Sequence, residues 1–121
     1  HLDENLTIEA DPEKLARVFN NILKNAASYS FPHTEIMISA EKLGHEVIIR
    51  FQNSGEDIPN EALASLFNKF YRVDQSRSSD TGGTGLGLAI AKEIVTLHGG
   101  AISASSKNHV VTFTVSLPLS N

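Results

Sequence analysis

The sequence predicts an α+β protein built as a two-layer α/β sandwich, in which a mixed, mostly antiparallel sheet carries about three helices on one face. Two observations lead to this prediction. Apolar residues recur three and four positions apart in two stretches, 12–31 and 88–98, which indicates amphipathic helices. Apolar residues alternate in two further stretches, 36–52 and 101–117, each broken by a turn, which indicates two hairpins.

The elements can be placed in chain order. The alternating run Leu6–Ile8 is expected to form a short edge strand. Asp11 and Pro12 start the first long helix, because Asp is a favoured N-cap and Pro fits the first helical position. This helix should end before Pro32, since the residue ahead of a proline avoids the α region. Its buried stripe comprises Leu15, Val18, Phe19, Ile22, Leu23 and Ala26.

Two strands follow, joined by a turn at 43–45, and a loop at 53–59 leads to a short helix from about 61 to 67. After a polar stretch at 74–82 and a glycine-rich loop comes the second long helix, which Gly99 and Gly100 close as a C-cap. The apolar side of that helix comprises Leu88, Ile90, Ala91, Ile94, Val95 and Leu97. The final hairpin places four apolar side chains on one face: Val111, Phe113, Val115 and Leu117.

Composition narrows the class of protein. The chain has 121 residues, 40% of them apolar and 20% charged, as in an ordinary globular domain with its own core. It has no cysteine, which excludes disulfides and thiolate chemistry within it. Its formal net charge of −4 gives no support to a nucleic-acid surface. Because it begins without Met, we expect a single domain, residues 1–121, of a longer protein.

Four of the eight glycines lie within residues 81–88, directly before the second long helix. Glycine leaves room for a group against the main chain, and the start of a helix attracts anions, so this segment suits a phosphate. A flexible loop ahead of a helix is the alternative. The segment is not a P-loop, because Gly87 is followed by Leu88 rather than Lys, and no strand precedes it as a dinucleotide fingerprint requires.

Asparagines form a second group of candidates. Asn21 and Asn25 are four apart, so they lie one above the other on the flank of the buried stripe. An Asn oxygen suits Mg²⁺, although each could be a surface residue. Asn53 ends a buried strand before a turn at Gly55, and its amide could accept from and donate to an adenine edge. An ordinary Asn-Ser-Gly turn is the alternative.

Arg72 is the third candidate. It follows an aromatic group and precedes the glycine-rich loop, where its guanidinium could grip phosphate oxygens or simply be solvated. The aromatic residues in question are Phe67, Phe70 and Tyr71. The five histidines look incidental, because no pair has the spacing of metal ligands.

In this order, the signals resemble the catalytic, ATP-binding domain of sensor histidine kinases, in the superfamily that includes gyrase, a heat-shock chaperone and a mismatch-repair ATPase. The resemblance covers essentially the whole chain. It rests on residues 21–29, 53–59, 67–74 and 83–88, which are similar to the N box, first glycine box, F box and second glycine box. It implies a Bergerat-type fold that holds ATP between the first long helix and a lid at about 59–84.

The resemblance also implies roles for individual residues. Asn25 would coordinate Mg²⁺, with Asn21 and Tyr29 beside the phosphates and ribose. Arg72 would contact phosphate, and Thr112 would help read the adenine. Backbone amides at Gly83, Gly85 and Gly87 would cradle the phosphates. The remaining residues expected at the nucleotide are Asn53, Gly55, Phe70, Tyr71, Leu86 and Leu88.

The chain departs from the family pattern at three positions. Asn53 replaces the usual Asp, Asp57 replaces the second glycine of its box, and Ser28 stands where many members have Lys. We expect adenine binding to persist in weaker form, since Asn still accepts a hydrogen bond. The Asn at the first glycine box and the Phe-Tyr-Arg, Arg-Ser and Thr-Gly-Gly sequences of residues 70–83 look most like the vancomycin-resistance sensor kinases.

Asn21 bears on the mechanism. ATP-hydrolysing relatives carry at this position a Glu that activates water, and a carboxamide takes no proton at neutral pH. The resemblance therefore implies a poor ATPase that holds ATP for a histidine in a separate N-terminal dimerisation domain, with a response regulator as a further partner. We expect a cytoplasmic part of a membrane-bound sensor, without nucleic-acid or direct membrane contact in this chain. A nucleotide-binding regulatory module and a protein serine kinase remain alternatives.

Overall fold

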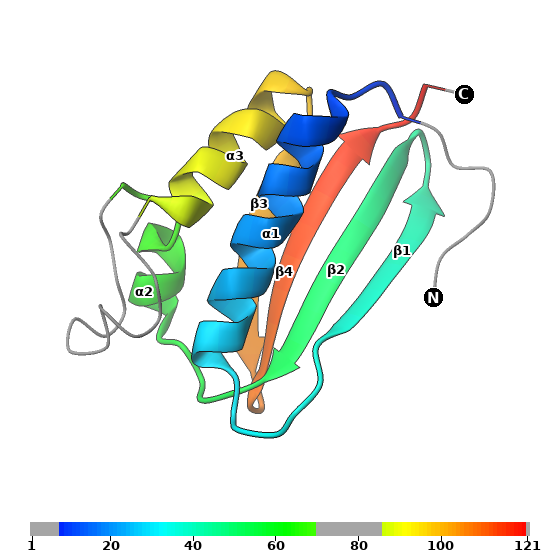
Figure 1. Cartoon of the computed structure of the whole chain (residues 1–121). Coiled ribbons are helices and arrows are strands. Elements are labelled where there is room, and N and C mark those ends of the chain that lie inside the picture. The colour runs from blue at the N-terminus through cyan, green and yellow to red at the C-terminus, as the bar shows by residue number, and fades with distance from the viewer. Residues whose placement is uncertain (1–7, 70–85, 121) are drawn as a thin grey trace.

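The fold is a four-stranded sheet covered on one face by helices (Figure 1). A computed structural model describes residues 8–69 and 86–120. The helices are α1 (Pro12–Tyr29), α2 (Asn60–Ser65) and α3 (Gly87–Leu97). The strands are β1 (Met37–Leu43), β2 (Glu46–Ser54), β3 (Ala101–Lys107) and β4 (Val110–Pro118). The predicted two-layer α+β sandwich is confirmed, and every pair of neighbouring strands among the described residues is antiparallel.

The strand order is β1-β2-β4-β3, so β2 and β4 are neighbours although α2, α3 and β3 separate them in the chain. Both β2 and β3 run antiparallel to β4, and they are therefore parallel to each other. The chain between them crosses over the sheet through the helices (Figure 1). Through this crossover, the start of α3 comes to lie beside α1, although the two are far apart in sequence. The candidate functional site described below lies where they meet.

The apolar pattern read from the sequence forms the core. Val18, Ile22 and Ala26 of α1 are fully buried, as the helical spacing predicted. On the sheet, the fully or almost fully buried side chains that face the helices are Phe51, Val111, Phe113, Val115 and Leu117. The rings of Phe19 and Phe51 lie 5.7 Å apart and join α1 to β2. Each such side chain contributes about 1.5–3 kcal/mol by leaving water.

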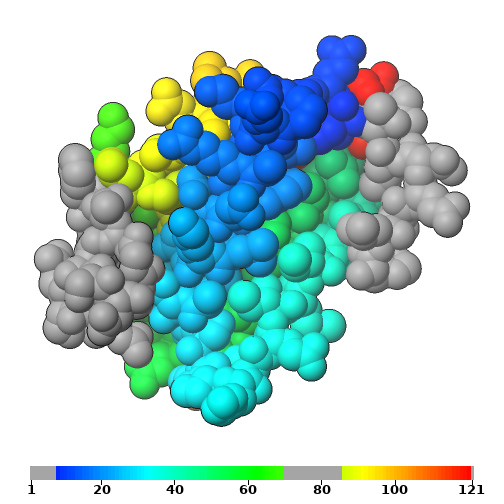
Figure 2. Space-filling model, viewed as in Figure 1, coloured from blue at the N-terminus to red at the C-terminus, as the bar shows by residue number. Residues whose placement is uncertain are grey.

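The start of α1 has the predicted cap. Asp11 Oδ1 accepts hydrogen bonds from the backbone N–H groups of Glu13 and Lys14, at 3.0 and 3.3 Å, and Pro12 occupies the first helical position. The helix ends at Tyr29, before Pro32 as expected. Figure 2 shows the outer surface of α1 running across the molecule between α3 and the β1–β2 hairpin.

The structure differs from the predicted elements at the end of the second long helix. Leu97 was placed on the buried side of the second long helix, which is wrong, because its side chain is 79% exposed. It lies two residues after the fully buried Val95, and a step of two residues turns a helix by about 200° to its opposite side.

The edge strand predicted at Leu6–Ile8 falls outside the described residues except for Ile8, which belongs to no strand. In the described parts of the chain, no helix has the length and hydropathy needed to span a bilayer.

Candidate functional site

The asparagine pair of α1 lies beside the first residue of α3, which Asn21 contacts directly. Asn21 Nδ2 donates to the backbone carbonyl oxygen of Gly87 at 3.0 Å. Asn25 Nδ2 donates to the backbone carbonyl oxygen of Asn21, also at 3.0 Å. A carbonyl only accepts, so the nitrogen of each carboxamide must face these partners. The oxygens are therefore on the other arm of each planar group. The structure thus brings together two candidate groups that are 66 residues apart in sequence.

Gly87 faces this pair closely. A Cβ added at Gly87 would lie 3.5 Å from Asn25 Nδ2 and 3.8 Å from Asn21 Cγ, which is ordinary van der Waals contact. Its φ is not in the left-handed region, so no backbone strain requires glycine here. The missing side chain instead leaves a space about the size of one methyl group beside the carboxamides.

The N-terminus of α3 has no cap within the described chain. Its first intrahelical bond runs from Ile90 N–H to Leu86 O at 2.9 Å, so the N–H groups of residues 87–89 have no acceptor inside the helix. The half-buried N-cap Leu86 makes no side-chain bond, and the first turn carries no acidic residue. Unpaired N–H groups and the positive end of the helix dipole favour an anion. Leu88 itself is buried in the core, so only its main chain is suited to a ligand.

Asn53 lies in β2 on the sheet face that the helices cover. It is the buried polar residue of the described core, with 2% of its surface exposed, and neither Oδ1 nor Nδ2 has a hydrogen-bond partner among the described residues. Leaving a buried polar group unpaired costs about 1–3 kcal/mol. Such a group needs a physical explanation, and a ligand that pairs with both atoms supplies one.

Gly55 joins the end of α1 to the end of β2. Ser30 and Gly55 form a β-bridge, and Phe31 N–H donates to Ser54 O at 2.8 Å. A Cβ at Gly55 would lie only 2.0 Å from the carbonyl oxygen of Tyr29, so the contact requires glycine. This contact brings Tyr29, the last residue of α1, to the strand end that carries Asn53.

The candidates therefore lie in order along α1. Asn21, Asn25 and Tyr29 are spaced by four residues, and each step advances about 6 Å along the helix axis. The first two adjoin the start of α3, and the last adjoins Gly55 beside Asn53. This row joins the start of α3, whose first N–H groups have no acceptor inside the helix, to the buried amide of Asn53. Its length and chemistry suit an extended nucleotide.

Thr112 does not share this arrangement. It pairs with Gln52 in the β2–β4 register, and its Oγ1 accepts from Gln52 Nε2 at 3.3 Å on the sheet face away from Asn53. The expectation that Thr112 helps read the base is corrected, because successive strand residues point to opposite faces. Val111 is the residue opposite Asn53, and it is fully buried. The alternation of the final hairpin already indicated this in the sequence.

Two departures from the family pattern have local partners. Asp57 Oδ1 accepts from His109 N–H at 2.7 Å, and Gly55 N–H donates to His109 O at 3.0 Å. Asp57 therefore ties the loop after β2 to the turn between β3 and β4. Ser28 Oγ donates to Lys24 O at 2.9 Å, one turn back along α1.

His98 was expected to be incidental, but it connects the two long helices. The backbone N–H of Asp11 donates to His98 Nε2 at 3.2 Å, and His98 Nδ1 lies 2.8 Å from Ile94 O. Since a carbonyl only accepts, Nδ1 carries the proton and Nε2 is the acceptor. The end of α3 is thus held against the start of α1.

Five candidates lie outside the described residues, and what the sequence predicts for them stays a prediction: Phe70, Tyr71, Arg72, Gly83 and Gly85. The lid expected at about 59–84 is described only up to residue 69.

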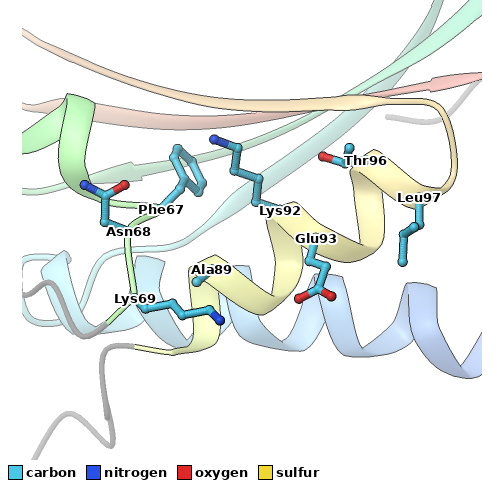
Figure 3. Close-up of a pocket in the computed structure, with 8 residues that line it drawn as sticks. All are labelled: Phe67, Asn68, Lys69, Ala89, Lys92, Glu93, Thr96 and Leu97. Carbon is cyan, nitrogen blue, oxygen red and sulfur yellow. The ribbon is translucent and has the colours of Figure 1, made fainter.

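A separate hollow of about 430 Å³ lies along α3 (Figure 3). Its lining is Phe67, Asn68, Lys69, Ala89, Lys92, Glu93, Thr96 and Leu97. None of the candidate site residues lines it, so it is distinct from the row of asparagines.

Comparison with known proteins agrees with this geometry. Residues 10–121 match the family described as histidine kinase-, DNA gyrase B-, and HSP90-like ATPase. The chain therefore belongs to this family, and ATP is the nucleotide that the family relation assigns to it.

Within the family, the chain is similar to catalytic domains of two-component sensor histidine kinases. It is 58% identical over 118 residues to the sensor protein VanS of Enterococcus faecium, covering 98% of this chain and 30% of that protein. It thus spans about a third of the length of this relative. The solved catalytic domain of histidine kinase ThkA has a TM-score of 0.81 and 31% identity, covering 96% of this chain and 73% of that one.

A second ThkA structure contains that kinase in complex with the response regulator protein TrrA. It matches with a TM-score of 0.79 and 28% identity, covering 98% of this chain and 32% of that one.

Proposed function

We propose that this chain binds ATP with Mg²⁺ and donates the γ-phosphoryl group to a histidine in a separate dimerisation domain of the same sensor kinase. The observation that carries the proposal is the bond from Asn21 to Gly87 O, which places Asn21 and the neighbouring Asn25 beside the start of α3, where no cap is found among the described residues. Membership of the ATPase family and similarity to sensor kinases support it.

The site fits each part of the nucleotide. Phosphates suit the N–H groups of residues 87–89, which have no acceptor inside the helix, and the base suits the buried amide of Asn53. Mg²⁺ takes oxygen ligands and keeps several waters, so the Asn25 oxygen together with phosphate oxygens is a suitable set. Bound there, Mg²⁺ would neutralise charge on the phosphates.

In this proposal, the described part of the site holds ATP in position but supplies no base for its hydrolysis. The Asn21 carboxamide is held by its bond to Gly87 O and takes no proton at neutral pH. Phosphoryl transfer depends mainly on positioning and charge neutralisation, so a site without a base suits a donor that waits for its acceptor. We therefore expect slow hydrolysis of ATP by the isolated chain.

Arg72 and the backbone amides of Gly83 and Gly85 complete the proposed phosphate contacts, with Phe70 and Tyr71 in the lid. The partners proposed for the whole protein are the N-terminal dimerisation domain with the acceptor histidine and a response regulator. The complex that ThkA forms with TrrA supports the second partner. Similarity to VanS supports a place in vancomycin-resistance signalling, as the cytoplasmic part of a membrane-bound sensor.

A calorimetric titration with Mg-ATP tests the binding site. Wild type is expected to bind, and Asn25→Ala to bind at least about tenfold more weakly, because the metal loses its protein oxygen ligand. Asn20→Ala is the matched control, since Asn20 is exposed on the same helix and makes none of these contacts. Equal affinities for all three proteins would refute the assignment of Asn25.

The transfer step is tested with the full cytoplasmic part of the kinase and ATP labelled at the γ-phosphate. Label on histidine, lost in acid and kept in alkali, is the expected result. Binding without retained label would instead indicate a regulatory nucleotide module, and acid-stable label a serine kinase. Rapid ATP hydrolysis by the isolated chain would contradict the role given to Asn21.

A further inference from the structure

We propose that Asn53 lets the nucleotide site accept guanine as well as adenine, so that this chain binds Mg-GTP with an affinity close to that for Mg-ATP. The proposal rests on the function proposed above, because it concerns the base in the same site. Its basis is a buried amide that nothing in the described chain holds in one orientation.

The surroundings of Asn53 leave both of its polar atoms uncommitted. The side chain is 2% exposed, and neither Oδ1 nor Nδ2 has a partner among the described residues. Val111, its neighbour across the sheet, is apolar and fully buried, and Gly55 has no side chain. A half-turn about χ2 therefore exchanges the C=O and NH₂ groups without breaking a hydrogen bond to a described residue, and the two orientations have almost the same shape.

The main chain next to Asn53 adds no fixed preference. Gly55 N–H already donates to His109 O at 3.0 Å, and Ser54 O already accepts from Phe31 N–H at 2.8 Å. Both groups are engaged in holding the loop to its neighbours. Among the described residues, the polarity of the base contact is thus left to the Asn53 amide.

The two purines present opposite patterns to this amide. Adenine offers an amino donor beside a ring-nitrogen acceptor, whereas guanine offers a carbonyl acceptor beside a ring N–H donor. In one orientation, the amide accepts from and donates to adenine. In the other, it donates to the guanine carbonyl and accepts from the ring N–H. A carboxylate only accepts, so it would leave the guanine carbonyl unpaired in a buried site.

Calorimetric titration of the chain with Mg-ATP and Mg-GTP tests the proposal. For wild type, we expect the two dissociation constants to lie within about tenfold of each other, since the amide pairs with both the amino or carbonyl group and the adjacent ring nitrogen of either base. For Asn53→Asp, we expect ATP binding within about tenfold of wild type and GTP binding at least about 100-fold weaker than ATP binding.

Gln52→Glu is the matched control, because it makes the same change from amide to carboxylate one residue away. Gln52 is exposed on the opposite sheet face, where it contacts Thr112, so the ratio of GTP to ATP affinity should stay at the wild-type value. The wild-type ratio is decisive even if Asn53→Asp does not fold.

The outcomes separate this inference from the function on which it rests. If wild type binds ATP but binds GTP more than about 100-fold more weakly, the inference that the site accepts both bases is overturned, whereas the proposed ATP site is not. Wild type that binds neither nucleotide overturns the proposed function. Undiminished GTP binding by a folded Asn53→Asp protein shows that residue 53 does not read the base.

Discussion

Replacing Gly55 by alanine should destabilise the fold through a single added methyl group. The new Cβ would lie 2.0 Å from Tyr29 O and 3.1 Å from Tyr29 C. Ordinary contact begins at 3.4 Å, so the end of β2 and the end of α1 must separate by roughly 1.4 Å, the difference between 3.4 and 2.0 Å. Both atoms belong to the main chain and have no flexible side chain to move aside.

The loss can be worked out from the bonds that close this junction. Phe31 N–H to Ser54 O and Gly55 N–H to His109 O measure 2.8 and 3.0 Å, and both lie where the chain must shift. Each hydrogen bond is worth about 0.5–1.5 kcal/mol, and forced overpacking adds about 1–3 kcal/mol. We therefore expect a loss of about 3 kcal/mol in the free energy of unfolding, or roughly 12 °C in melting temperature for a domain of this size.

Thermal and urea denaturation of the isolated chain, followed by circular dichroism, would measure this loss. Gly87→Ala is the matched control, because its Cβ meets nothing closer than 3.5 Å and its φ is not left-handed. That variant should melt at or above the wild-type temperature. A Gly55→Ala protein that melts within about 2 °C of wild type would refute the argument from close approach.

Three further changes follow from the same structure. Gly87→Ala should gain up to about 1 kcal/mol in stability but bind Mg-ATP at least about tenfold more weakly, because its Cβ fills the space beside Asn25; calorimetry showing unchanged affinity would contradict this. Asn53→Leu removes two buried polar atoms that have no partner among the described residues, so urea denaturation should show an unfolding free energy about 1–2 kcal/mol higher for the nucleotide-free chain, and Mg-ATP should no longer stabilise the variant. A variant less stable than wild type would show that the Asn53 amide does have partners in the folded protein. His98→Ala should cost about 1 kcal/mol and speed hydrogen exchange at the Asp11 amide, which loses its acceptor; unaltered exchange there would show that the contact is not formed in solution.

Local chemistry made much of the fold predictable. The position of α1 could be predicted from Asp11, Pro12 and the apolar stripe. Capping and helical spacing act over only one or two turns, so these signals lie within the helix itself and at its start. The hairpins could be found for the same reason, and Gly44, with φ of 65°, occupies the turn between β1 and β2. Leu97 was misplaced because it is hydrophobic yet lies at the helix end, turned away from the sheet.

The candidate site was predictable in its parts. Paired asparagines, a turn after a buried strand and a glycine-rich helix start are each recognisable from spacing, and the order in which they occur indicates the family. The role of Thr112 was mistaken because its residue type was weighed above the strand alternation that turns it away from Asn53. The hydrogen bonds of Asp57 and His98 could not be predicted from the sequence, because their partners lie 52 and 87 residues away in the chain.

The sequence alone determined the elements and the family, because caps, turns and apolar periods depend on near neighbours along the chain. Only the tertiary structure decided that β4 lies between β2 and β3, that Gly87 faces Asn21, and that the Asn53 amide is buried without a partner among the described residues. These facts depend on how the crossover packs the helices against the sheet, where burial and hydrogen bonding link residues that are distant in sequence. For the same reason, the glycines of the two boxes differ: close approach requires Gly55, whereas the missing side chain of Gly87 leaves space beside the Asn21 and Asn25 carboxamides.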